Sequence, residues 1–197
     1  MNTKEHIKNP KTPATLANPP GGALVWFIIF MEMVTFIAGI FFFFAYKQDE
    51  QTLFLEMQQK LNINYAVANT LFLVTSGFFA ALSLNYLKNN LRQKSRNNLL
   101  ISIVLGVGFL ILKSIEYSEK INQGYTTSFN HFFTFYWFLT FFHFAHVLFA
   151  TFILLFLYFK IKNQEEDEII ALEVGTSLWH MCDLIWILLF PTLFIIR

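Results

Sequence analysis

The sequence has few of the residues that cover a water-facing surface or cross-link a secreted domain. Only 14% of its 197 residues are Asp, Glu, Lys or Arg, whereas a soluble domain carries roughly 25%. It has one cysteine, Cys182, so no disulfide can form within the chain. The net charge of +1 gives no long-range field to attract an acidic partner. These shortages exclude nucleic-acid-binding proteins, soluble enzymes and disulfide-rich secreted scaffolds.

Long hydrophobic runs dominate what is present. Hydrophobic residues make up 55% of the chain, and phenylalanine alone contributes 26 residues. Five runs, each near or above the ~20 residues that cross a bilayer core, occupy residues 23–46, 66–87, 97–117, 131–159 and 174–196. A helix satisfies all its own backbone hydrogen bonds in lipid, and the runs are too long for barrel strands. The sequence therefore predicts an all-α integral membrane bundle of five transmembrane helices.

The remaining segments predict a domain division and an orientation. Residues 1–20 hold four of the five prolines, and we expect a flexible cytoplasmic tail there, ahead of a membrane domain over residues 21–197. With the N-terminus inside, nine Lys and Arg residues fall in inner segments and four in outer segments. The positive-inside rule then places the N-terminus in the cytoplasm and the C-terminus on the outer side. The acidic run 165–168 is expected to be a solvated inner loop.

Several polar side chains interrupt the hydrophobic runs, where an ionisable group costs about 2.5–3.5 kcal/mol at a helix centre. The set is Glu32, Asn69, Lys113, Glu116, His143, His146, His180 and Asp183. Glu32 shares a helical face with Thr35 and Gly39, so this face must point into the bundle or toward a partner protein. Its carboxyl is either a structural hydrogen-bonding group or one that handles protons or contacts lipid headgroups.

Spacing predicts how some of the other side chains pack. The second span carries a seam of small and polar residues that suits a close helix interface, made of Asn69, Leu73, Ser76, Ala80 and Ser83. Lys113 and Glu116 are three residues apart, which predicts a local ion pair. Tyr117 beside them is expected in the interfacial aromatic belt.

Three histidines and an aspartate lie in the last two spans. His143 and His146 share one face of span 131–159, and His180 and Asp183 share a face of span 174–196. These side chains could bind a metal ion, but the paired Glu-x-x-His motifs of a di-iron bundle are missing from the sequence. We expect hydrogen bonds between helices instead, and we assign no catalytic, cofactor-binding or metal-binding residue.

The order of the motifs resembles subunit III of the haem–copper oxidase superfamily. In chain order they are the aromatic-rich segment 26–36 around Glu32, Asn69-Thr70, Leu73-Val-Thr-Ser-Gly77, Glu116-Tyr117, His143-Phe-Ala-His146 and Trp179-His-Met-Cys-Asp-Leu-Ile-Trp186. The resemblance reaches only the last five of the seven helices of the common form, and Phe144 stands where that family has glycine. Segments 73–81 and 113–120 are especially similar to the five-helix NorE-type subunit associated with nitric oxide reductases.

The resemblance implies a non-catalytic accessory subunit of a cytochrome c oxidase or nitric oxide reductase complex in the bacterial inner membrane. Haem and metal would belong to the large catalytic subunit. This chain would stabilise that subunit, bind structural phospholipid and support proton uptake, with Glu32 as the family's buried carboxylate. From the residues alone, two alternatives stay open: a small independent proton or ion transporter, and an integral metalloenzyme built on the histidines and Asp183.

Overall fold

The computed structural model describes residues 22–161 and 166–196. In these residues every regular element is a helix, and the helices are α1 (Ala23–Asp49), α2 (Gln51–Gln59), α3 (Ile63–Lys88), α4 (Arg92–Asn122), α5 (His131–Lys160) and α6 (Glu166–Phe194). All except α2 are long and apolar enough to cross a membrane. The predicted all-α bundle with five spans is confirmed. The predicted tail at residues 1–20 lies outside the described residues.

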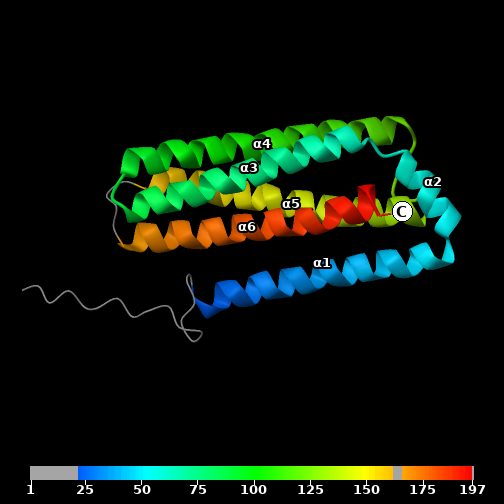
Figure 1. The fold of residues 1–197 in the computed structure, drawn as a ribbon, viewed down its shortest axis with the longest axis horizontal. Coiled ribbons are helices and arrows are strands. Elements are labelled where there is room, and N and C mark those ends of the chain that lie inside the picture. The colour runs from blue at the N-terminus through cyan, green and yellow to red at the C-terminus, as the bar shows by residue number, and fades with distance from the viewer. Residues whose placement is uncertain (1–21, 162–165, 197) are drawn as a thin grey trace, which may run out of the picture.

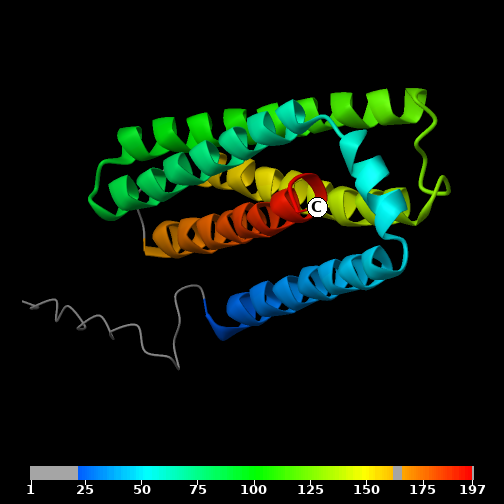
Figure 2. The same ribbon diagram turned by 45° about the vertical axis from the view of Figure 1, so that its right-hand side comes forward.

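Four of the long helices form the main bundle, and α1 lies beside them (Figure 1). α3 packs against α4 and α6, and α5 packs against the same two helices, so α3 and α5 occupy opposite corners. α1 contacts α5 and α6 along one side of this bundle. Figures 1 and 2 both show the short α2 lying across the end of the bundle where α1 ends and α3 begins.

The helices extend past the hydrophobic runs because polar caps determine where they start and turn. The side chain of Asn62 accepts a hydrogen bond from the backbone N–H of Asn64 at 3.0 Å, and Asn130 accepts one from Phe133 at 2.9 Å. Asn90 has φ of 61°, in the left-handed region that asparagine tolerates better than most residues. This conformation lets α3 turn back directly into α4.

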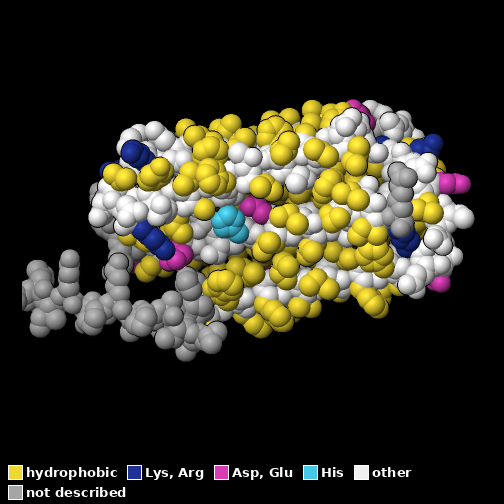
Figure 3. Space-filling model, in the orientation of Figure 1, with side chains coloured by type: hydrophobic (Ala, Val, Ile, Leu, Met, Phe, Trp, Pro, Cys, Tyr) yellow, Lys and Arg dark blue, Asp and Glu magenta, His cyan; other side chains and the backbone are white. Residues whose placement is uncertain are grey.

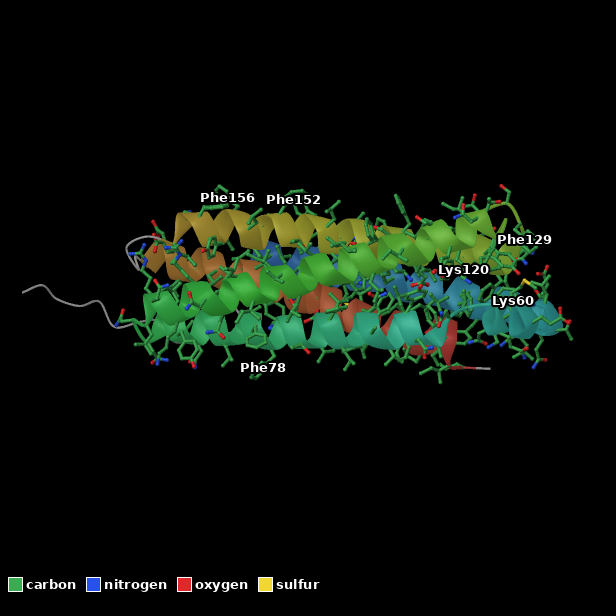
Figure 4. The ribbon with its side chains drawn as sticks, turned by 90° about the horizontal axis from the view of Figure 1, so that it is seen from above. Lys60, Phe78, Lys120, Phe129, Phe152 and Phe156 are labelled. Atoms are coloured by element: carbon green, nitrogen blue, oxygen red, sulfur yellow. The ribbon has the colours of Figure 1, made fainter. Side chains whose placement is uncertain are left out.

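The short helix α2 was not predicted, and it helps to close one end of the bundle. Gln58 Nε2 of α2 and Lys47 Nζ of α1 both donate to the backbone carbonyl of Ile196, at 3.1 Å and 2.7 Å. Lys120 Nζ at the end of α4 donates to the carbonyl of Lys60 at 2.6 Å, and Figure 4 labels both lysines. These bonds join the ends of α1, α4 and α6 through the α2 region.

The small-residue seam predicted on α3 is buried, and it faces α4. All five of its members are at most a few per cent exposed: Asn69, Leu73, Ser76, Ala80 and Ser83. The Ser76 hydroxyl donates to the carbonyl of Ser102 at 2.7 Å, and the hydroxyls of Ser83 and Ser95 lie 3.1 Å apart. Small side chains let the two backbones approach closely, and their hydroxyls then bond across the interface.

The acidic run 165–168 differs from the solvated loop that was predicted. Helix α6 begins at Glu166, and Glu168 in its first turn is only 7% exposed. Acidic side chains are stabilised at a helix N-terminus by the unpaired backbone N–H groups there. Most of the run therefore starts a helix, and residue 165 lies outside the described residues.

Candidate functional site

A carboxylate–imidazole pair joins α1 to α5. Glu32 Oε2 lies 3.1 Å from His146 Nε2, and the two side chains are 27% and 20% exposed. The rings of Phe36 and Phe142 pack against the imidazole, at centroid distances of 5.8 Å and 4.5 Å.

Of the predicted face, Glu32 and Gly39 point at α5, where Leu139 lies against the glycine. The prediction is wrong for Thr35, which is exposed and donates to the carbonyl of Met31 in its own helix.

The second ring nitrogen of His146 is already hydrogen-bonded within α5. Nδ1 lies 2.8 Å from the backbone carbonyl oxygen of Phe142, which can only accept, so Nδ1 donates to it. Nε2 is then the ring nitrogen that faces the Glu32 carboxyl, and the contact is an ion pair when the ring is protonated on both nitrogens. An acid and a base placed side by side can neutralise each other, which lowers the cost of placing them in lipid.

A second polar group is completely enclosed by the bundle. Lys113 Nζ lies 2.9 Å from Glu116 Oε2, and both side chains are fully buried. The Tyr136 hydroxyl on α5 donates to the other Glu116 oxygen at 2.5 Å. The ion pair predicted from the i, i+3 spacing is confirmed, and Tyr136 is a member that the sequence analysis missed.

Aromatic rings surround the Lys113 ammonium. Nζ lies 5.3 Å from the ring centroid of Tyr117, 5.2 Å from those of Tyr136 and Trp186, and 5.7 Å from that of Phe194. Ring faces attract a cation, most strongly where water is excluded. Tyr117 is only 8% exposed. Its ring therefore packs inside the bundle beside the Lys113 ammonium, and not at the membrane surface as predicted.

His143 and His146 share a face by spacing, but they reach different surroundings. His143 is fully buried and stacks on Trp186, with ring centroids 5.4 Å apart and planes 25° apart. Phe109 of α4 meets the same imidazole edge-on at 5.8 Å. Neither ring nitrogen of His143 has a hydrogen-bond partner among the described residues. His143 therefore belongs to the bundle core, whereas His146 faces α1.

The polar pair on α6 faces α3. His180 Nδ1 lies 3.3 Å from Asp183 Oδ2. The Trp186 indole N–H, one turn further along, donates to the Thr70 hydroxyl at 2.9 Å. Asn69, beside Thr70, is completely buried, and neither atom of its amide has a partner in the described part of the chain.

The eight polar residues singled out in the sequence thus form three separate pairs, with His143 and Asn69 in the core. Within residues 22–161 and 166–196 there is no group of three or more His, Cys, Asp and Glu side chains placed to hold a metal ion. His180 pairs with Asp183 and His146 with Glu32, so the four side chains of the metalloenzyme alternative do not converge.

These features define a multi-pass helical membrane protein in which three pairs of ionisable side chains lie between and within the helices. The sequence pattern of the family "Cytochrome c oxidase subunit III" matches residues 22–196. This match includes every helix described here. The chain belongs to the cytochrome c oxidase subunit III family.

Individual relatives agree with this membership. Cytochrome c oxidase subunit 3 of Rhipicephalus sanguineus is 33% identical over 131 residues, covering 64% of this chain and 49% of the relative. Cytochrome c oxidase subunit 3 of Bacillus sp. (strain PS3) is 23% identical over 190 residues, covering 94% and 90%. Cytochrome bo(3) ubiquinol oxidase subunit 3 of Buchnera aphidicola subsp. Acyrthosiphon pisum (strain APS) is 22% identical over 176 residues, covering 87% and 84%. The chain spans about half the length of the first of these and most of the other two.

Proposed function

We propose that this chain is a non-catalytic accessory subunit of a respiratory haem–copper superfamily complex, whose haem and metal lie in a separate large subunit. The observation that carries the proposal is the family match over residues 22–196, which includes all five spans. Relatives named as subunits of two different oxidases support it. The chain would stabilise the catalytic subunit, bind phospholipid and support proton uptake.

The Glu32–His146 pair is the group best suited to proton uptake. An acid and a base lie 3.1 Å apart, and both side chains are partly exposed. A proton can therefore reach or leave the pair without opening the helix packing. Lys113 and Glu116, by contrast, are fully buried and held by four aromatic rings, which fits a structural role.

Phospholipid binding is supported by two features of the surface. α1 presents large apolar side chains outward, among them Phe27, Phe30 and Phe41, which are 64%, 62% and 67% exposed. Acyl chains pack well on such a surface. Near the end of the bundle where α4 begins, the Arg96 guanidinium lies 4.8 Å from the Tyr158 ring centroid, which places a cation where a lipid phosphate would lie.

The cytoplasmic location of the N-terminus is part of the same proposal. α1, α4 and α6 begin at the end of the bundle where α3 and α5 finish (Figure 1). Basic residues concentrate at that end: Lys88, Arg92, Lys94, Arg96 and Lys160. Inner segments of membrane proteins carry such an excess, and for a bacterial chain the membrane would be the inner one.

The experiment that tests the function is purification of the tagged chain from its native membrane in mild detergent, followed by partner identification and a haem spectrum. The proposal expects a haem-containing membrane subunit in the purified complex. Copper in that complex would indicate an oxidase. Non-haem iron with b-type haem would indicate a nitric oxide reductase, with this chain as its NorE-type accessory subunit. A chain that emerges alone and haem-free contradicts the proposal, and proton flux into vesicles containing only this chain would then establish the transporter alternative.

A further inference from the structure

A polar patch lies on the outward face of the bundle, where α3 and α6 meet. His180 is at the centre of α6 and its side chain is 44% exposed. Its neighbours on this face are apolar and also exposed: Val74 and Phe78 on α3 are 47% and 59% exposed, and Leu184 on α6 is 54% exposed. Figure 3 shows a histidine and an acidic side chain side by side in the middle of this largely hydrophobic face.

Asp183 is seated in the groove beneath His180. Its side chain is 9% exposed and lies directly against Gly77 of α3, where any Cβ would collide with Asp183 Oδ2. A Cβ at this position would also come within 3.3 Å of His180 Cε1. Glycine at position 77 therefore leaves the space in which the carboxylate sits.

The hydrogen bonding of Asp183 is incomplete. Oδ2 faces His180 Nδ1 at 3.3 Å, which is a long contact, and Oδ1 is buried without a hydrogen-bond partner among the described residues. A buried acceptor left unpaired is costly, and lipid acyl chains have no donor to offer. His180 is the member of the pair that a neighbouring protein can reach: its side chain is nearly half exposed, and its Nε2 has no hydrogen-bond partner among the described residues.

We propose that this α3–α6 face docks a transmembrane helix of the catalytic subunit, and that this helix places an N–H or O–H donor opposite His180 Nε2. The inference rests on the proposed function. Two observations argue for this occupant: the patch lies midway along α6, too deep for a lipid headgroup, and the exposed Nε2 of His180 lies in an apolar face that supplies no donor. A second copy of this chain fits less well, because a twofold contact through the patch would place two identical imidazoles opposite each other, each with Nδ1 donating to Asp183 and Nε2 left as an acceptor.

Photo-crosslinking on the two faces of the bundle tests the position of the interface. Phe78 and Phe152 are each 59% exposed, and Figure 4 shows them on opposite sides of the bundle. A photoreactive amino acid replacing Phe78 should crosslink to the haem-containing subunit in the native membrane, whereas the same amino acid replacing Phe152 should not. Crosslinks at Phe78 to a second copy of this chain, or only to lipid, would overturn the proposal, as would crosslinks to the haem subunit from Phe152 alone.

A pair of leucine variants tests the chemistry of the patch. His180→Leu should lower the haem subunit that co-purifies with the chain by about tenfold, as expected for one interhelical hydrogen-bonding group in a membrane. Phe152→Leu is the matched control and should leave co-purification unchanged. His180 is half-exposed, so its replacement should not unfold the bundle, and the thermal unfolding of each purified variant checks this. Unchanged co-purification of His180→Leu would contradict the proposal, because it is the result expected if the face contacts lipid.

The two proposals fail in different ways. If the unmodified chain brings down no haem subunit, the accessory function itself is wrong. If the unmodified chain brings it down but the crosslinks come from the Phe152 side, only the docking face is wrong.

Discussion

Lys113 and Glu116 lie one turn apart on α4, with Nζ and Oε2 2.9 Å from each other and both side chains fully buried. Removing one member of such a pair leaves the other charged or polar group unpaired in the membrane interior. We expect Lys113→Met to destabilise the bundle by about 3–5 kcal/mol. The double variant Lys113→Met/Glu116→Gln should recover most of that loss, because Gln can still accept from Tyr136. Thermal unfolding in detergent measures the stability of the single and the double variant.

The exposed pair Lys88–Glu173 provides the control for this prediction. Its Nζ–Oε1 distance is also 2.9 Å, but the side chains are 45% and 23% exposed. Lys88→Met should change the unfolding free energy by less than about 1 kcal/mol. Equal effects at Lys88 and Lys113 would show that burial does not determine the strength of the buried pair.

Gly106 and Trp179 give a second prediction, about packing between α4 and α6. A Cβ at position 106 would lie 2.5 Å from Cη2 of the Trp179 indole, and this indole is completely buried. Gly106→Ala should therefore destabilise the bundle by about 1–3 kcal/mol through overpacking. Gly108→Ala on the same helix meets only the edge of Phe72, at 3.3 Å. It should be neutral or slightly stabilising, because alanine favours the helix by up to about 1 kcal/mol. Comparison of the two unfolding temperatures checks the prediction.

Two variants of Glu32 can distinguish a structural role of this side chain from a proton-handling role. Glu32→Gln keeps a polar side chain of the same size against His146 Nε2, so the α1–α5 contact and the thermal stability should be nearly unchanged. The variant can no longer exchange a proton at this position. We expect the complex to assemble normally but to lose activity faster than the wild type during continuous turnover, and repeated activity assays on the purified complex measure this.

Glu32→Leu is the companion variant, because it removes both the acidic group and the polar contact with His146. It should weaken the attachment of α1 and lower the yield of the complex. If Glu32→Gln leaves the turnover-dependent loss of activity unchanged, Glu32 has no part in proton uptake, whatever the leucine variant does.

The orientation of the chain can be tested with single cysteines in a Cys182→Ser background. Asn90 lies in the turn between α3 and α4, and Gln123 directly follows α4 at the opposite end of the bundle. In intact spheroplasts, a thiol reagent that cannot cross membranes should label Gln123→Cys at once. It should label Asn90→Cys only after the membrane is permeabilised. The reverse pattern would place the N-terminus outside.

The five spans were predictable because each one needs only a long apolar run, and hydrophobicity is a property of the sequence itself. α2 was missed for the same reason: its nine residues, including three glutamines, form no such run. The Lys113–Glu116 pair was predictable because i, i+3 neighbours on a helix meet whatever the rest of the fold does.

Contacts between helices were harder to predict, because the hydrophobic runs do not determine the rotation of each helix. His146 is the partner of Glu32, but nothing in the spacing distinguishes it from His143, which stacks on Trp186 instead. Tyr136 is one aromatic residue among many on α5, and only the packing of α4 against α5 brings its hydroxyl to Glu116.

The contact between Glu32 and His146 has a consequence for biosynthesis. A chain made from its N-terminus completes α1 before α2, α3 and α4, and only then reaches the histidine on α5. Until that helix enters the membrane, the Glu32 carboxyl has no imidazole beside it. The first described helix to be synthesised can therefore take its final place only after the fifth has been inserted, so the order of assembly in the membrane differs from the order of translation.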